Sequence, residues 1–192
     1  MTGLDPRTTA LVLIDLQRGI LANPLAPHAP ADVVARSRVL ADRLRAAGGT
    51  IVWVTVDWAK GFVDAPAQPT DIAAARSPDG PPADFAELVP ETGVQPGDLR
   101  IVKRQWGAFY GTELDLQLRR RGIDTIVIAG VATNLGVEST ARDGWERGYA
   151  MIFAEDATST FSEPMHRFAF DTIFPRLGRV VSCDAIAQAF PA

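Results

Sequence analysis

The chain alternates between short apolar runs and longer amphipathic segments. Short runs rich in valine, isoleucine and threonine, bounded by glycine or polar residues, are typical of strands buried on both faces of a parallel sheet. Segments with apolar residues three and four positions apart are typical of helices that cover such a sheet. The expected strands are residues 9–14, 50–56, 99–102, 124–129, 149–154 and 179–181. The expected helices are residues 31–47, 112–121, 133–147, 163–174 and 184–190.

Strands that alternate with helices imply an α/β fold, with helices on both faces of a parallel sheet. The 192 residues suit one α/β domain with a sizeable core, and no linker or internal repeat divides them. We therefore interpret residues 1–192 as a single domain. Residues 57–98 differ from the rest, because they hold seven prolines and no sustained periodicity. A stretch of this length without regular structure is usually functional, and we expect a lid or a similar element here.

Composition and charge exclude several classes of partner. The net charge is −4 and no run of basic residues occurs apart from residues 119–121, which close a predicted helix, so we expect no nucleic-acid partner. No apolar run approaches the ~20 residues of a membrane span, so no membrane partner is expected. The first seven residues lack a signal-peptide pattern, and the single cysteine excludes an intramolecular disulfide. A cytoplasmic location follows as the default.

The joint between the fourth strand and its helix is the first candidate site. Residues 123–147 combine a buried strand, a turn of small residues and a helix that begins near Thr133 or Asn134, either of which can cap it. Such a joint brings unpaired backbone N–H groups to one point, which suits an anion or an oxyanion. An ordinary β-turn-α joint explains the same pattern.

Two charged residues at strand ends are further candidates. Asp15 follows an apolar run, so burial would raise its pKa, whereas a nearby lysine would lower it. Lys103 is one of only two lysines beside seventeen arginines, which favours a role for its compact charge. A structural carboxylate at Asp15 and a chance lysine at Lys103 remain the alternatives.

Four segments together resemble the isochorismatase-like, or cysteine hydrolase, superfamily. They are LVLIDLQ at residues 11–17, KRQWGAFYGT at 103–112, GVATNLGVESTAR at 130–142 and FPRLGR at 174–179. The resemblance implies a three-layer α/β/α fold whose six-stranded parallel sheet has the Rossmann-like order 3-2-1-4-5-6. Asp15 and the turn at 133–136 would then form the two sides of one crevice, with Lys103 at the same edge of the sheet. It also implies a non-proline cis peptide near Val131–Ala132.

The resemblance assigns Asp15 as the catalytic aspartate and Lys103 as its partner, but Gly136 stands where most members have a nucleophilic cysteine. A covalent route through sulfur is therefore closed. Cys183 lies in another part of the chain, and we interpret it as a small buried hydrophobe. True isochorismatases also lack the cysteine, and they protonate the enol-pyruvyl carbon of a vinyl ether with an aspartic acid.

By this resemblance the leading hypothesis is a hydrolase of an isochorismate-like vinyl ether, with Asp15 as general acid and Lys103 as a clamp for a carboxylate. Gly136 would leave room for substrate, and the backbone from Ala132 to Gly136 would bind a carboxylate. The turn itself looks like that of the amidase branch, with the cysteine alone exchanged. Two alternatives stay open: a C–N hydrolase in which Asp15 activates water, and a pseudoenzyme or binding module that lost its nucleophile.

The remaining assignments concern the pocket, metals and assembly. Gln17, Arg104, Trp106, Phe109, Tyr110, Ala132 and Thr133 are the candidates for contact with a small-molecule substrate, and core packing is favoured for Phe109. His28 and His166 look isolated from each other and from any metal spacing, so no metal or cofactor is expected. The resemblance favours a homodimer or homotetramer in which residues 65–96 complete a neighbour's pocket. A monomer with its own lid is the alternative.

Overall fold

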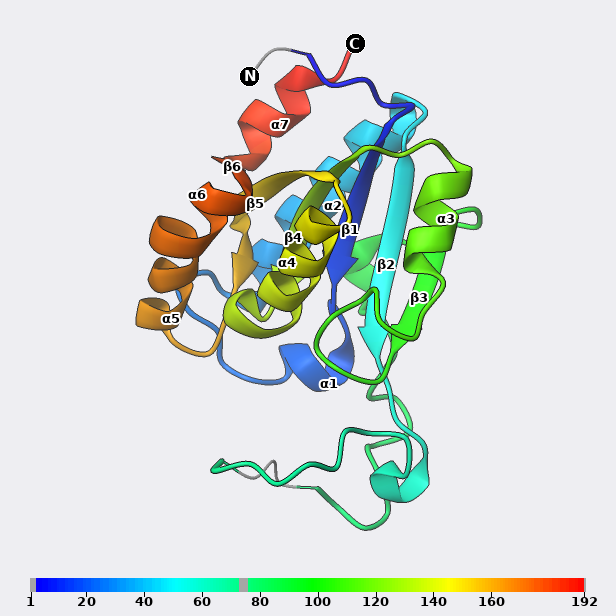
Figure 1. Cartoon of the computed structure of the whole chain (residues 1–192), viewed down its shortest axis with the longest axis vertical. Coiled ribbons are helices and arrows are strands. Elements are labelled where there is room, and N and C mark those ends of the chain that lie inside the picture. The colour runs from blue at the N-terminus through cyan, green and yellow to red at the C-terminus, as the bar shows by residue number, and fades with distance from the viewer. Residues whose placement is uncertain (1–2, 73–75, 192) are drawn as a thin grey trace.

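The computed structural model describes residues 3–72 and 76–191, which form a six-stranded parallel sheet with helices on both faces (Figure 1). The strand order is β3-β2-β1-β4-β5-β6, and every pair of neighbours is parallel. This confirms the predicted architecture and strand order. The strands are β1 (Thr9–Ile14), β2 (Thr50–Val56), β3 (Leu99–Lys103), β4 (Thr125–Val131), β5 (Ala150–Ser159) and β6 (Gly178–Val181).

Alternate side chains of the central strands enter two separate cores. On β1, Leu11 and Leu13 pack in the core under one helical layer, whereas Val12 and Ile14 pack in the core under the other. This division follows from the period of two along a strand, and it makes every central strand apolar on both faces. One layer holds α2 (Pro30–Ala46) and α7 (Cys183–Ala189). The other holds α3 (Leu114–Arg120), α4 (Glu138–Glu146), α5 (Glu163–Phe168) and α6 (Phe174–Leu177).

The structure differs from the prediction within two of the predicted helices and at the end of one strand. Residues 133–137 form a π-helical turn before α4, and residues 169–173 form a second one between α5 and α6. We call the Thr133–Val137 segment the π-turn. Neither Thr133 nor Asn134 caps it, because the N-cap position is Ala132 and no side chain makes the cap hydrogen bond. Strand β5 runs to Ser159, five residues beyond the predicted end at 154.

Residues 57–72 and 76–98, the described part of the connection between β2 and β3, have little regular structure, as predicted. This connection contains 3₁₀ turns at Lys60–Phe62 and Pro90–Thr92. A short helix after β1, α1 (Arg18–Leu21), was not predicted. Much of the described part of the connection extends away from the sheet at the edge where the strands end (Figure 1). Its role as a lid stays a prediction. Across residues 3–72 and 76–191, the helices are all too short or too polar to span a bilayer.

Gly130 is a position in β4 at which a side chain would not fit beside β1. It pairs with Ile14 in the β1–β4 register, and its φ of 115° lies in the region that favours glycine. A Cβ atom at this position would overlap the backbone of Ile14, including its carbonyl oxygen. Ile14 immediately precedes Asp15. The glycine at position 130 therefore allows β4 to lie close to β1 directly beside the candidate site.

We expect Gly130→Ala to lower the free energy of unfolding by more than about 3 kcal/mol, because backbone strain and a clash with backbone atoms add. Gly122→Ala is the matched control, since its φ is 66° but the described residues leave the space around its Cβ open. We expect the control to lose about 1 kcal/mol. Urea unfolding followed by tryptophan fluorescence measures both, and equal losses would contradict the role given to Gly130.

Candidate active site

A buried ion pair joins the carboxyl ends of β1 and β3. Lys103 is the last residue of β3, and its Nζ donates to Oδ2 of Asp15 at 2.6 Å. Lys103 is 1% exposed and Asp15 is 5% exposed. The backbone N–H of Asp15 donates to the carbonyl of Val54 on β2, which lies between the two strands in the sheet. The lysine side chain therefore reaches across the end of β2 to the aspartate.

The two oxygens of Asp15 have different surroundings. Oδ2 accepts from Lys103, whereas Oδ1 is buried and has no hydrogen-bond partner within residues 3–72 and 76–191. Burial raises the pKa of Asp15 from 3.8 to about 6, and the Lys103 ammonium opposes this shift through its charge and its hydrogen bond. A carboxyl with a pKa near neutrality and one free oxygen is suited to donate or accept a proton.

Gly136 faces this pair from the π-turn. A Cβ atom placed on Gly136 would lie 3.2 Å from Asp15 Oδ2 and 3.4 Å from Lys103 Nζ. It would also lie 3.0 Å from Cγ2 of Ile14. The structure therefore brings Asp15, Lys103 and Gly136 together as the sequence predicted. Gly136 therefore borders the ion pair with its backbone alone, and a side chain at this position would fit only tightly.

The π-turn follows a cis peptide bond between Val131 and Ala132, which confirms that prediction. The Ala132 carbonyl accepts from the N–H groups of Leu135 and Val137, both at 3.1 Å. Thr133 is fully buried, and its hydroxyl lies 2.9 Å from Nδ1 of His166. The residues of the turn thus alternate in direction: Gly136 faces Asp15 and Lys103, whereas Thr133 faces α5.

Gln17, a predicted substrate contact, has a structural environment instead. Its side chain is fully buried, and its amide nitrogen donates to the carbonyls of Val56 at 2.9 Å and Phe85 at 3.0 Å. Its amide oxygen accepts from the N–H of Val56 at 2.8 Å. The amide therefore holds the end of β2 and the returning part of the 57–98 connection against β1. These bonds explain its position without a bound substrate.

The segment after β3 divides its predicted pocket residues. Trp106 and Tyr110 are 62% and 77% exposed, and so remain available to a ligand. Phe109 is buried in the core and stacks on Tyr149 with ring centroids 5.9 Å apart, so the core packing that was favoured for it is confirmed and it is not a pocket wall. Arg104 pairs with Asp64 at 2.8 Å and donates to the carbonyl of Asp57.

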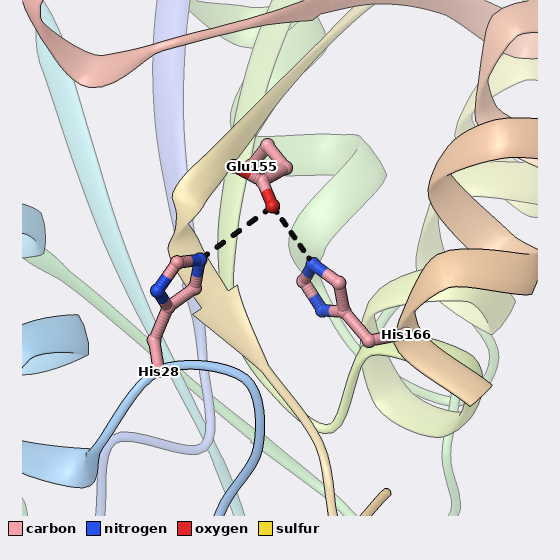
Figure 2. A group of neighbouring side chains, drawn as sticks. All are labelled: His28, Glu155 and His166. Atoms are coloured by element: carbon pink, nitrogen blue, oxygen red, sulfur yellow. Dashed lines mark hydrogen bonds and ion pairs between the residues drawn. The ribbon is translucent and has the colours of Figure 1, made fainter. Parts of the chain in front are cut away.

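The sequence failed to identify one cluster of side chains. His28 and His166 were expected to be isolated from each other, but their ring centroids are only 5.9 Å apart. Both imidazoles approach the same oxygen of Glu155, as Figure 2 shows. The contact joins a loop, a strand and a helix that are distant along the chain. Local spacing carries no signal for such a contact, so the prediction that the two histidines are isolated was wrong.

Comparison with known proteins agrees with this geometry. Residues 9–185 match the model of the isochorismatase domain. The uncharacterized isochorismatase family protein YecD of Escherichia coli O157:H7 is 46% identical over 98% of this chain and 100% of its own length. YwoC of Bacillus subtilis, also an uncharacterized isochorismatase family protein, is 51% identical over 92% of this chain and 90% of its own length.

Two further likenesses concern function and structure. The ureidoacrylate amidohydrolase RutB of Stutzerimonas stutzeri is 32% identical over 96% of this chain and 83% of its own length. The solved structure of an isochorismatase family protein from Burkholderia thailandensis matches with a TM-score of 0.93 and 42% identity. That match covers 99% of this chain and 98% of the other.

The raised pKa of Asp15 predicts a difference in pH dependence between the wild type and Asp15→Asn. Between the unfolded pKa of 3.8 and the folded pKa of about 6, the folded wild type binds more protons than the unfolded chain. Its free energy of unfolding, relative to the variant, should therefore fall by about 3 kcal/mol as pH rises through this window. Urea unfolding of both proteins between about pH 4 and about pH 7 measures the difference. A difference that does not change with pH would contradict the assignment.

Gly136→Cys should fold and carry a reactive thiol. The Lys103 ammonium would lie beside the sulfur and stabilise the thiolate, while Ile14 needs only a small shift to admit the Cβ. At about pH 6, iodoacetamide should label this cysteine about tenfold faster than an exposed one or more.

Glu146→Cys, exposed at the far end of α4, provides the matched control, and both proteins carry Cys183→Ser. Labelling no faster than in the control, in a folded protein, would show that position 136 does not face the Asp15–Lys103 pair. Loss of the fold would show that the glycine is required for packing.

Proposed function

Because the chain belongs to the isochorismatase family, we propose that it is a hydrolase that cleaves an isochorismate-like vinyl ether, with Asp15 as general acid and without a covalent intermediate. The observation that carries this proposal is the arrangement around Asp15. One carboxyl oxygen is held by Lys103, the other is buried and unpartnered among the described residues, and Gly136 borders the pair without a side chain.

The chemistry follows from these groups. Asp15 delivers its proton to the methylene carbon of the enol ether, and the π electrons of the double bond form the new C–H bond. The resulting oxocarbenium ion takes up water, which returns a proton to the carboxylate, and the hemiketal collapses to a ketone and an alcohol. The Lys103 ammonium balances the carboxylate and binds a substrate carboxylate. With a pKa of about 6, about a tenth of Asp15 is protonated at pH 7 before substrate binds.

The only sulfur nucleophile in the chain is poorly placed for an alternative. Cys183 is buried in the core beneath α2 and α7, on the sheet face opposite to the core that contains Val137 of the π-turn. Burial also raises the pKa of its thiol, which disfavours the reactive thiolate. A mechanism that needs no covalent nucleophile therefore fits this chain better than one that needs a cysteine.

A second candidate is hydrolysis of a C–N bond by water that ionised Asp15 activates. The similarity to ureidoacrylate amidohydrolases favours it, as does the position of Gly136 beside the carboxylate and ammonium. The two mechanisms need opposite protonation states of one group. Acid catalysis requires Asp15 to hold its proton, so kcat/KM falls above about pH 6, whereas base catalysis makes kcat/KM fall below about pH 6.

We expect the purified protein to release pyruvate from isochorismate, with kcat/KM decreasing about tenfold per pH unit above about pH 6. Asp15→Asn should lower this rate at least about a hundredfold, because it removes the general acid. Asp42→Asn, an exposed carboxylate on α2, is the matched control and should keep the wild-type rate.

A parallel panel of small amides, including ureidoacrylate, with ammonia detection tests the second candidate. Ammonia release without pyruvate, with the opposite pH profile, would replace the first proposal by the second. Binding of these compounds without turnover would leave a binding module.

A further inference from the structure

We propose that His28, Glu155 and His166 bind one divalent ion of the first transition series, for which Zn²⁺ is the probe. This site is separate from the Asp15–Lys103 pair and does not depend on the proposed hydrolase activity. Three different elements supply its donors: the loop before α2 supplies His28, strand β5 supplies Glu155, and helix α5 supplies His166. Figure 2 shows the two imidazoles converging on the carboxylate from opposite sides.

The distances between donors suit a tetrahedral ion. Oε1 of Glu155 lies 3.2 Å from Nε2 of His166 and 3.5 Å from Nε2 of His28. Zinc bonds of about 2.0–2.1 Å at tetrahedral angles place neighbouring donors about 3.3 Å apart. All the donor atoms of the three residues lie within 4.8 Å of one another. Small side-chain rotations are therefore enough to enclose an ion, and a fourth position remains for water.

The chemistry of the donors selects the class of ion. Two imidazoles and one carboxylate suit Zn²⁺ and its neighbours in the first transition series. Calcium and magnesium favour sites made of oxygen ligands, so they are poor candidates here. Burial lowers the pKa of His166 and so favours the neutral imidazole that metal binding requires.

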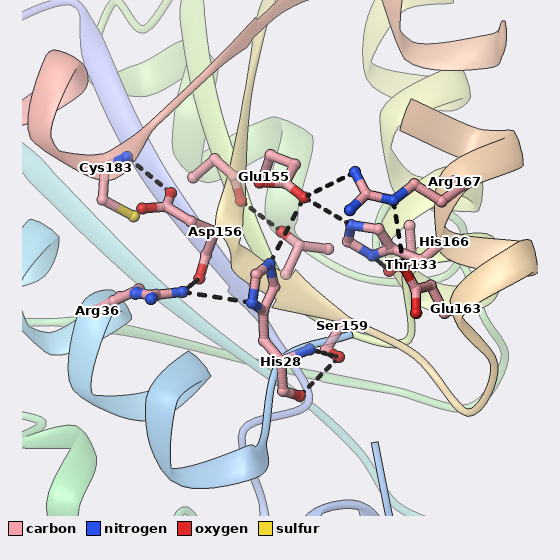
Figure 3. Close-up of polar contacts among 12 residues, drawn as sticks. His28, Arg36, Thr133, Glu155, Asp156, Ser159, Glu163, His166, Arg167 and Cys183 are labelled. Atoms are coloured by element: carbon pink, nitrogen blue, oxygen red, sulfur yellow. Dashed lines mark hydrogen bonds and ion pairs between the residues drawn. The ribbon is translucent and has the colours of Figure 1, made fainter. Parts of the chain in front are cut away.

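The surrounding contacts hold the donors in place. Nδ1 of His166 lies 2.9 Å from the hydroxyl of Thr133, and a proton shared there leaves Nε2 free to bind an ion. The backbone of His28 is fixed by Ser159, whose hydroxyl accepts from the His28 N–H at 3.2 Å and donates to the His28 carbonyl at 2.8 Å. Figure 3 shows these contacts around the cluster.

One donor is left unsatisfied without an ion. Nε2 of His28 is a buried atom that lacks a hydrogen-bond partner in the part of the chain that the structure describes. A buried polar atom without a partner is unfavourable, and a metal bond removes this cost. The unsatisfied atom points at the same carboxylate oxygen as His166, which is the geometry of a shared ligand site.

Two arginines lie near the cluster. Nη1 of Arg36 donates to the carbonyl of Asp156 at 2.6 Å and lies 3.5 Å from Nδ1 of His28. Nη1 of Arg167 lies 3.8 Å from Oε1 of Glu155, while its Nε lies 3.6 Å from Glu163. Because the Arg167 side chain is 53% exposed, it can turn fully toward Glu163 when an ion occupies the carboxylate.

The test uses untagged, chelator-stripped protein carrying Cys183→Ser, so that the thiol cannot bind the ion. The chain contains only two histidines, so ¹⁵N NMR of the imidazoles resolves both rings during a Zn²⁺ titration. We expect the Nε2 signals of His28 and His166 to shift together and to saturate at one ion per chain. Glu155→Gln should weaken Zn²⁺ binding at least about tenfold, and Glu163→Gln, the matched control, should change it less than about twofold.

Several results would overturn the proposal: no shift of either Nε2, a shift of His28 alone, or wild-type affinity in a folded Glu155→Gln protein. They would leave the cluster as a carboxylate that is hydrogen-bonded to His166 and lies close to His28. If Glu155→Gln fails to fold, His28→Ala takes its place, since it alters a loop residue and leaves the β5–α5 contact intact. In that variant the Zn²⁺ affinity should fall at least about tenfold, and unchanged affinity would equally overturn the site.

Discussion

The ion pair between Asp15 and Lys103 is the constraint on which the site depends. A buried charge is costly, and removing one member of a buried pair destabilises a protein by about 3–5 kcal/mol. The two residues meet because all strands of the sheet are parallel and end at one edge, with β2 alone between β1 and β3. Two effects on Asp15 oppose each other, because burial raises its pKa and the touching Lys103 ammonium lowers it. The balance of these effects leaves the pKa of the carboxyl near neutral pH, where it can exchange a proton.

Much of this arrangement was predictable from the sequence, because it depends on local patterns. The apolar runs of β1, β2 and β4 are strong signals for buried strands, and Asp15 stands out as a charge at the end of such a run. The strand order and the partnership of Asp15, Lys103 and Gly136 came from the resemblance of whole motifs. Periodicity alone gives no register between distant strands, and it could not have brought those three residues together.

The remaining features depend on tertiary contacts that local patterns do not encode. A π-turn differs from an α-helical start by one hydrogen-bond step, so Thr133 and Asn134 look like ordinary caps in the sequence. Their side chains instead contact His166 and Thr160, across the end of β5. Gln17 similarly looks like a site residue beside Asp15, although its amide is hydrogen-bonded to backbone groups. The meeting of His28 with His166 depends on the folded positions of a loop and a helix.

The π-turn has two faces, and this has a thermodynamic consequence. Gly136 borders the pair of Asp15 and Lys103, while Thr133, three residues earlier, contacts His166 behind it. Both contacts belong to one continuous turn of five residues, so a displacement of the whole turn would change both. If a molecule that restrains Thr133 changes the affinity for a second molecule beside Asp15 and Lys103, the second molecule changes the affinity for the first by the same factor. The π-turn is thus the one segment that touches both the ion pair and His166 among the contacts described above.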